Sequence, residues 1–166
     1  MPPVLLKQVT PYNATTPTDC RIVDGKISAF GAIEATSTDR VIDASGLTLL
    51  PGAMDMHVHF RVPGGEQKED WVTGTSAALA GGVTTVLDMP NTTPAITTKK
   101  LLEDKIAHIT AQQHPIDFGC YIGATNDNLD ELLLVQDLAC GIKIAPYFTG
   151  KNGKALIDDV TALQKV

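Results

Sequence analysis

The feature that most constrains the fold is a regular alternation of strand-like and helix-like segments after residue 50. Each strand-like run is short and apolar, and each is followed by a stretch of helical composition or periodicity. The four runs are AMDMHVHF, VTTVLDM, IDFGCYIGA and GIKIA. Strands separated by helices pair in parallel through right-handed crossovers. The order therefore predicts an α/β fold with four βα units, at most half of an eight-unit barrel of about 250 residues.

The stretches between these strands predict helices with recognisable ends. The first places Val72, Thr75 and Leu79 on one face and is stopped by Gly81-Gly82. We expect helices from about Lys68 to Ala80, from a cap at Thr97 or Thr98 to a point before Pro115, from Asn126 to Leu138, and over the final KALIDDVTALQKV.

The first fifty residues have a different rhythm, made of short β-prone runs and turns. RIVDGKISAFGAI carries Asp24-Gly25 between two such runs, which indicates a hairpin. We therefore expect residues 1–50 to form a small β-layer, part of a composite β-sandwich. Residues 51–166 are expected to form the first half of a (β/α)8 barrel.

Composition excludes several classes of function and location. The formal net charge of −6 argues against nucleic acid or an acidic membrane surface as partner. No apolar run approaches the roughly 20 residues of a membrane span, and no signal peptide is apparent. Cys20, Cys120 and Cys140 are far apart and odd in number, which is typical of reduced thiols. A cytoplasmic globular protein is expected.

His57-Val58-His59 is the first candidate site, at the end of the first barrel strand. Residues two apart in a strand point to the same face, so the two imidazoles could share one divalent metal ion. Two histidines hydrogen-bonded to neighbours at a strand edge are the alternative that the local pattern leaves open.

Arg61 and Asn91 follow the first and second strands and are expected at the same end of the sheet as His59. A guanidinium there can clamp a carboxylate through two hydrogen bonds, and an amide can donate to the same carboxylate. Taken singly, a solvated loop arginine and a turn asparagine beside Pro90 explain these residues equally well.

Lys143 is flanked by Ile142 and Ile144 in GIKIA, so its side chain faces opposite to theirs. A lysine in a barrel interior has a depressed pKa and a nucleophilic amine, which can add carbon dioxide. The resulting carbamate could bridge two metal ions. A lysine on a solvated strand edge is the alternative.

A longer stretch resembles a known family. Residues 51–94, PGAMDMHVHFRVPGGEQKEDWVTGTSAALAGGVTTVLDMPNTTP, are similar to the start of the barrel in dihydroorotases of the amidohydrolase superfamily. The HxHxR order, the KED-x3-GT-x-AA-x-AGG helix and the MPNT turn carry the resemblance, which extends more weakly through the β-layer and GIKI. Hydantoinases and allantoinases are sister families that usually lack the arginine.

The resemblance implies a role for each candidate residue. His57 and His59 would bind the first of two zinc ions, and Lys143, as a carbamate, would bridge them, although some dihydroorotases use another residue there. Arg61 and Asn91 would bind the carboxylate of dihydroorotate or N-carbamoyl-L-aspartate. The implied reaction is the reversible cyclisation of carbamoyl aspartate in pyrimidine biosynthesis, with a metal-activated hydroxide attacking the ring carbonyl.

The resemblance also implies parts that the sequence lacks. Dihydroorotases take two further histidine ligands and a catalytic Asp from the second barrel half, and no histidine follows Lys143. His108 and His114 fall in or after a helix, so no catalytic residue is assigned. We expect an N-terminal portion of a longer enzyme, inactive alone, that needs the other half or forms a homo-oligomer. A hydantoinase or allantoinase, or a non-catalytic assembly partner, is the alternative.

Overall fold

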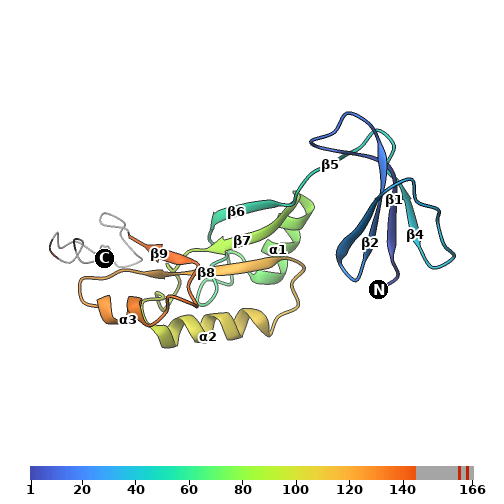
Figure 1. Cartoon of the computed structure of the whole chain (residues 1–166). Helices are drawn as coiled ribbons and strands as arrows, with labels where there is room; N and C mark the ends of the chain where they lie inside the picture. Colours follow the sequence, from blue (N-terminus) through green and yellow to red (C-terminus); the bar gives the residue numbers. More distant parts are fainter. Residues whose placement is uncertain (145–160, 162–163, 165–166) are drawn as a thin grey trace. The chain divides into compact units, whose positions relative to one another are not determined.

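The computed structural model describes residues 1–144, 161 and 164 (Figure 1). The chain divides into two compact units, Met1–Pro51 and Gly52–Val166. Apart from residues 161 and 164, the helix expected over residues 154–166 lies outside the described part of the chain.

The first unit is a five-stranded sheet in the order β3-β2-β1-β4, with β5 also paired to β1. Pairs β1–β2 and β2–β3 are antiparallel, whereas β4 and β5 run parallel to β1. The predicted hairpin is confirmed, because Asp24 and Gly25 join β2 to β3 with φ of 49° and 75°. The strands are β1 (Val4–Pro11), β2 (Thr18–Val23), β3 (Lys26–Gly31), β4 (Arg40–Asp43) and β5 (Thr48–Leu49).

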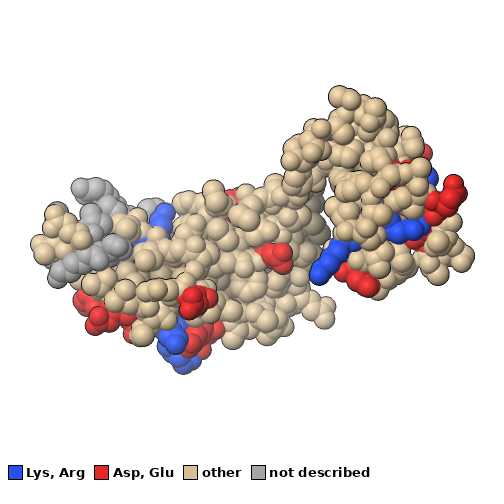
Figure 2. All heavy atoms as spheres, viewed as in Figure 1, with Lys and Arg blue, Asp and Glu red and all other residues tan. Residues whose placement is uncertain are grey.

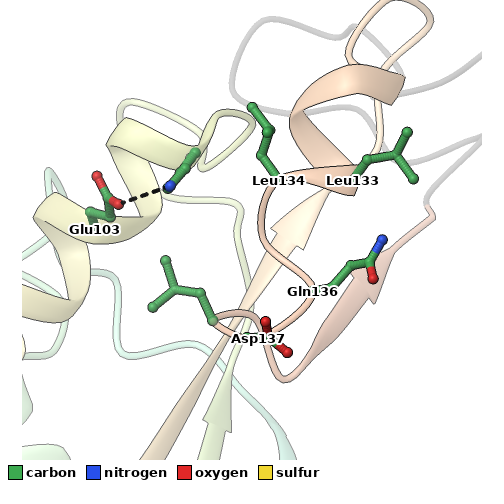
Figure 3. A pocket seen from close by; sticks show the side chains of 7 residues that line it. Glu103, Leu133, Leu134, Gln136 and Asp137 are labelled. Atoms are coloured by element: carbon green, nitrogen blue, oxygen red, sulfur yellow. Dashed lines mark ion pairs between the residues drawn. The ribbon is translucent and has the colours of Figure 1, made fainter.

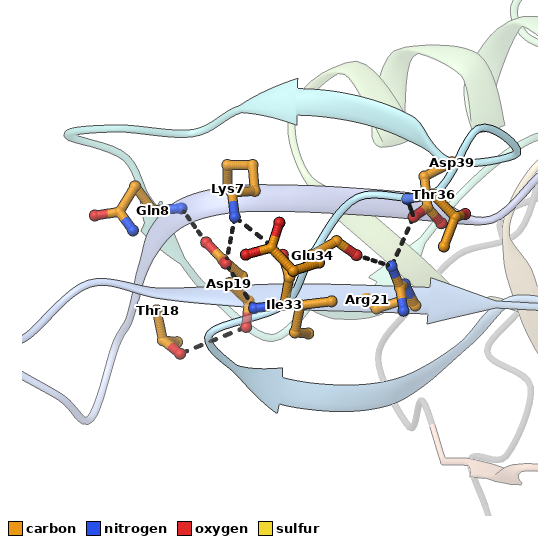
Figure 4. Close-up of polar contacts among 9 residues, drawn as sticks. All are labelled: Lys7, Gln8, Thr18, Asp19, Arg21, Ile33, Glu34, Thr36 and Asp39. Carbon is orange, nitrogen blue, oxygen red and sulfur yellow. Dashed lines mark hydrogen bonds and ion pairs between the residues drawn. The ribbon is translucent and has the colours of Figure 1, made fainter.

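A buried carboxylate organises the polar interior of this unit (Figure 4). Asp19 is 2% exposed and accepts hydrogen bonds from the backbone N–H groups of Gln8 and Ile33, each at 3.0 Å. Its Oδ2 also pairs with Lys7 Nζ at 2.6 Å. The Ile33 and Lys7 bonds, with that from Gln8, hold the pKa of Asp19 well below its usual range.

The second unit contains a parallel sheet with the order β6-β7-β8-β9. Consecutive strands are neighbours, and α2 and α3 lie against one face of the sheet (Figure 1). This arrangement confirms the predicted fold class, a β-layer followed by part of a (β/α)8 barrel. The elements are β6 (Ala53–Val58), α1 (Trp71–Ala80), β7 (Val83–Asp88), α2 (Lys99–Thr110), β8 (Asp117–Gly123), α3 (Leu129–Leu133) and β9 (Gly141–Lys143).

Helix α1 starts later than expected because the Asp70 side chain caps it, accepting the Thr73 N–H at 2.8 Å. Of the three residues expected on one face, Thr75 is buried, whereas Val72 and Leu79 are 49% and 44% exposed. The large indole of Trp71 and the absence of a side chain at Gly74 decide which face of α1 packs against the core. The buried residues of α1 are Trp71, Gly74 and Thr75.

Helix α2 agrees closely with the expected segment. Thr98 caps it through the Leu101 N–H, and the helix ends before Pro115. The solvent side carries i,i+4 ion pairs, so acidic and basic side chains alternate on the α2 side of the unit in Figure 2. These pairs are Lys99–Glu103 and Lys100–Asp104.

Helix α3 is much shorter than the segment predicted from Asn126 to Leu138. Asn128 precedes it and is tied to surrounding loops, accepting from Thr125 N–H and donating to the carbonyl oxygens of Thr97 and Gly123. After residue 133 the backbone makes i→i−3 bonds typical of turns. The leucines continue beyond residue 133, so leucine content alone does not predict where α3 ends. No helix in the described part of the chain is long and apolar enough to cross a membrane.

Candidate active site

The histidine pair lies at the carboxyl end of the first barrel strand, as the alternation predicts. His57 belongs to β6 and is exposed, and His59 follows the strand and is half-buried. Their ring centroids lie 5.2 Å apart, with ring planes inclined by 53°. Two imidazoles are thus placed side by side where a parallel strand gives way to its loop, the edge at which barrel enzymes carry their sites.

Asn91 contacts His59 directly, across two neighbouring strands. The Nδ1 of His59 and the Oδ1 of Asn91 are 2.7 Å apart. A carbonyl oxygen only accepts, so Nδ1 carries the hydrogen and Nε2 keeps its lone pair. Partial burial lowers the pKa of His59, and the charge of Arg61 acts in the same direction, while the bond to Asn91 opposes it. The neutral imidazole is therefore favoured, which is the form that binds metals.

Arg61 and Asn91 belong to two loops that are packed on each other. Arg61 is half-buried and has a left-handed backbone with φ of 65°. Beyond it, Gly64 approaches the other loop so closely that a Cβ there would lie 2.3 Å from the carbonyl oxygen of Thr93. The Thr93 N–H in turn donates to Pro63 O at 3.0 Å. The loops after β6 and β7 are therefore packed against each other beside the histidines.

Asp88 and Lys105 support this edge and were not predicted from the sequence. Their side chains are each 1% exposed, with Lys105 Nζ 2.5 Å from Asp88 Oδ2. The other carboxylate oxygen accepts the Phe60 N–H at 3.0 Å. One sequence signal could have indicated that Lys105 is buried. It lies on the apolar stripe of α2, between the buried Leu102 and Ile109.

The remaining candidate lies further along the sheet. Lys143 ends β9 and is half-buried, and β7 and β8 stand between that strand and β6. Its carbonyl accepts the Ala124 N–H at 2.9 Å. Within the described residues, no three His, Cys, Asp or Glu side chains converge as a metal cluster. The geometry therefore brings together His57, His59 and Asn91, and leaves the role of Lys143 a prediction.

The other two histidines have structural contacts. His108 lies near the end of α2 and its Nε2 is 2.8 Å from the Gln112 amide nitrogen. His114 bonds the Ile116 carbonyl at 2.8 Å and packs against the rings of Trp71 and Phe118. His108 thus lies in a helix and His114 after it, at the positions expected from the sequence.

A surface hollow of about 440 Å³ lies elsewhere, beside the start of α2 and the segment that follows α3 (Figure 3). It is open, and none of the candidate site residues lines it. Its lining residues are Lys99, Glu103, Leu133, Leu134, Gln136, Asp137 and Leu138.

Comparison with known proteins identifies the family. The family model described as "Amidohydrolase family" matches residues 48–163. The chain belongs to the amidohydrolase family. Members of this family are generally metal-dependent. Curated dihydroorotases match at 41–53% identity, which confirms the predicted resemblance to the N-terminal region of these proteins.

Three similar proteins show the range of named activities. The dihydroorotase of Methanosarcina acetivorans is 41% identical over 135 residues, covering 80% of this chain and 28% of that protein. The allantoinase of Deinococcus radiodurans is 43% identical over 137 residues, covering 81% and 30%. The solved structure of L-hydantoinase (dihydropyrimidinase) from Arthrobacter aurescens superposes with a TM-score of 0.84 at 27% identity, covering 99% and 37%. The chain thus spans between 28% and 37% of these relatives' lengths.

Proposed function

We propose that this chain forms part of a zinc-dependent cyclic amidohydrolase, a dihydroorotase that interconverts dihydroorotate and N-carbamoyl-L-aspartate in pyrimidine biosynthesis. The observation that carries the proposal is the arrangement of side chains at the carboxyl ends of the paired strands β6 and β7. It places His57 beside His59, and Asn91 in contact with His59, with Arg61 in the adjoining loop.

The residues present fit a metal ion. Both histidines offer ring nitrogens at one strand end, and the bond from His59 Nδ1 to Asn91 leaves Nε2 free to ligate. His57 and His59 would hold the first zinc, and Lys143 as a carbamate would bridge it to a second. Bound zinc supplies Lewis acidity at the scissile amide.

The chain's own residues would bind and orient the substrate. The Arg61 guanidinium can hold the substrate carboxylate through two parallel hydrogen bonds, which fixes the ring relative to the histidines. Asn91 keeps His59 in one tautomer through Oδ1 and can donate to the same carboxylate through its amide nitrogen. No general base is assigned among the residues described here, so we propose that the 166 residues alone bind zinc without hydrolysing substrate.

The alternative enzyme is a hydantoinase or allantoinase, favoured by the allantoinase match and by the likeness to L-hydantoinase. Hydantoin and allantoin carry no carboxylate, so a site for them gives Arg61 no partner. The other alternative is a non-catalytic assembly partner, which has no need of paired histidines. We further propose a cytoplasmic location, because the three free cysteines suit a reducing compartment. We also propose that the chain acts as a homo-oligomer or together with the other half of the barrel.

The test measures zinc content and ligand binding by the purified protein. We expect bound zinc, with dihydroorotate or carbamoyl aspartate binding at least tenfold more tightly than hydantoin. R61M should remove that preference, because methionine keeps the stem and loses the guanidinium, while K100M on the exposed face of α2 should not. Equal binding of hydantoin would favour the alternative enzymes, and a stable metal-free oligomer would favour the assembly partner.

A further inference from the structure

A buried ion pair joins helix α2 to the candidate site. Asp88 ends β7 and Lys105 lies on α2, and their side chains are each 1% exposed. Removing two charges from water costs free energy, and the attraction between them does not always compensate for that cost. An apolar pair of the same volume is often as stable. The contacts that the two side chains make beyond each other are therefore informative.

Each partner reaches the backbone of a site loop. Asp88 Oδ1 accepts the N–H of Phe60, the residue after His59, at 3.0 Å. Lys105 Nζ donates to Met89 O at 3.2 Å, two residues before Asn91. This ion pair therefore contacts the backbone of two segments, one next to His59 and the other close to Asn91. The side chains of these two residues are bonded to each other.

The backbone between the two strands completes the arrangement. The Met89 N–H donates to Val58 O at 3.0 Å, so the residues on both sides of His59 are held by the end of β7. The peptide at Val58 is fixed by Met89 and the peptide at Phe60 by Asp88. His59 itself bonds Asn91 at 2.7 Å.

We propose that Asp88 and Lys105 are positioning residues that set the separation of the two strand ends, and through it the orientation of His59 toward the metal. The inference rests on the proposed metal-binding function for its effect on zinc. The ion pair contacts backbone groups of the two site loops. It acts through Phe60 and Met89.

Two double variants separate the two contacts. D88L/K105M replaces the pair with apolar side chains of similar size and removes both backbone contacts. D88N/K105M also removes the charges but keeps an oxygen that can accept the Phe60 N–H. I109A is the matched control, since Ile109 is buried on the same face of α2, one turn further from the site.

Zinc affinity of the purified protein is measured by competition with a chromogenic chelator. We expect at least a tenfold loss in D88L/K105M, a smaller loss in D88N/K105M, and a change within twofold in I109A. Wild-type affinity in D88L/K105M, or an equal loss in I109A, would overturn the proposal. If circular dichroism shows that D88L/K105M does not fold, D88N/K105M decides alone, and an unchanged affinity in it contradicts the inference.

A second readout needs no metal. In the zinc-free protein, the His59 Nδ1–H that bonds Asn91 should give a slowly exchanging imidazole signal by NMR. We expect this signal to be lost in D88L/K105M and kept in I109A. A wild-type protein that binds no zinc refutes the proposed function, while this signal still tests the positioning role. A signal that persists in D88L/K105M refutes the positioning role itself.

Discussion

At the scale of single residues, a buried carboxylate in each unit fixes the backbone around it. Asp19 receives two backbone N–H groups in the first unit, and Asp88 receives one in the second. Each is also paired with a lysine, Lys7 or Lys105. A buried carboxylate is tolerated only when such partners satisfy its oxygens, so its removal affects the groups left behind as well as the ion pair.

The depressed pKa of Asp19 makes the first unit sensitive to acid. The Ile33 N–H, Lys7 and the Gln8 N–H stabilise the ionised form, so the folded pKa lies below the unfolded value of about 3.9. The contribution is fully present above about pH 4 and is lost as the pH falls through lower values. We expect D19N to be less stable than wild type at pH 7 and closer to it at pH 3.

Urea titrations followed by the amide NMR signals of β1 and β2 measure this difference. K7M is the companion variant, and we expect it to retain part of the pH dependence because both backbone donors to Asp19 remain. A stability gap between D19N and wild type that is as wide at pH 3 as at pH 7 would contradict the assignment.

The residues of the candidate site differ in how far the sequence predicts their positions. His57 and His59 were predictable because alternation in a strand is a local rule. Asn91 was placed at the right edge from strand order, but its contact with His59 depends on how two loops pack. The ion pair between Asp88 and Lys105 joins a strand to the outer helix, and no local pattern predicts that pairing.

At the scale of elements, loop packing holds the strand ends together. Gly64 has φ of 85° and lies against the loop after β7, where a Cβ would meet the Thr93 carbonyl at 2.3 Å. Gly82 has nearly the same φ, 83°, but a Cβ there would meet nothing within 4 Å. The two glycines therefore separate the cost of a left-handed backbone from the cost of crowding.

We expect Gly82→Ala to lower the free energy of unfolding by about 1 kcal/mol, from the backbone alone. Gly64→Ala should cost a further ~1–3 kcal/mol, because a backbone carbonyl must move. Trp71, the chain's single tryptophan, lies in the core of this unit and reports urea unfolding by its fluorescence. Equal losses in the two variants would mean that the loops separate at little cost.

Elements were predicted best where signals agreed. The four barrel strands and α2 were expected at nearly their observed positions, because β-branched runs, a threonine cap and a proline stop coincide. α3 was predicted too long, since its leucines continue past residue 133 while the backbone turns. The buried face of α1 was not predicted. Gly74 belongs to that face, and a glycine has no apolar side chain that would mark it in the sequence.

At the scale of the whole molecule, each unit has its own core. The first is small and includes Cys20, and the second is larger and includes Cys120. Both cysteines are almost fully buried, at 0% and 1% exposure, whereas Cys140 is exposed. Because one buried thiol lies in each core, the cysteines can report the unfolding of the two units separately.

We expect alkylation of the native protein at neutral pH to modify Cys140 first. Burial raises the pKa of all three thiols, that of Cys120 to about 12, so exposure decides the order. Cys140 is exposed and meets the reagent in the folded protein, whereas Cys20 and Cys120 are covered while their cores are intact. Mass spectrometry of peptides after pulsed labelling across a urea series then gives one unfolding curve for each unit. Cys20 should follow the sheet of the first unit, and Cys120 should follow Trp71 fluorescence. Labelling of Cys120 in native buffer at the rate of Cys140 would show that the core around β8 is open to solvent, against the packing described here.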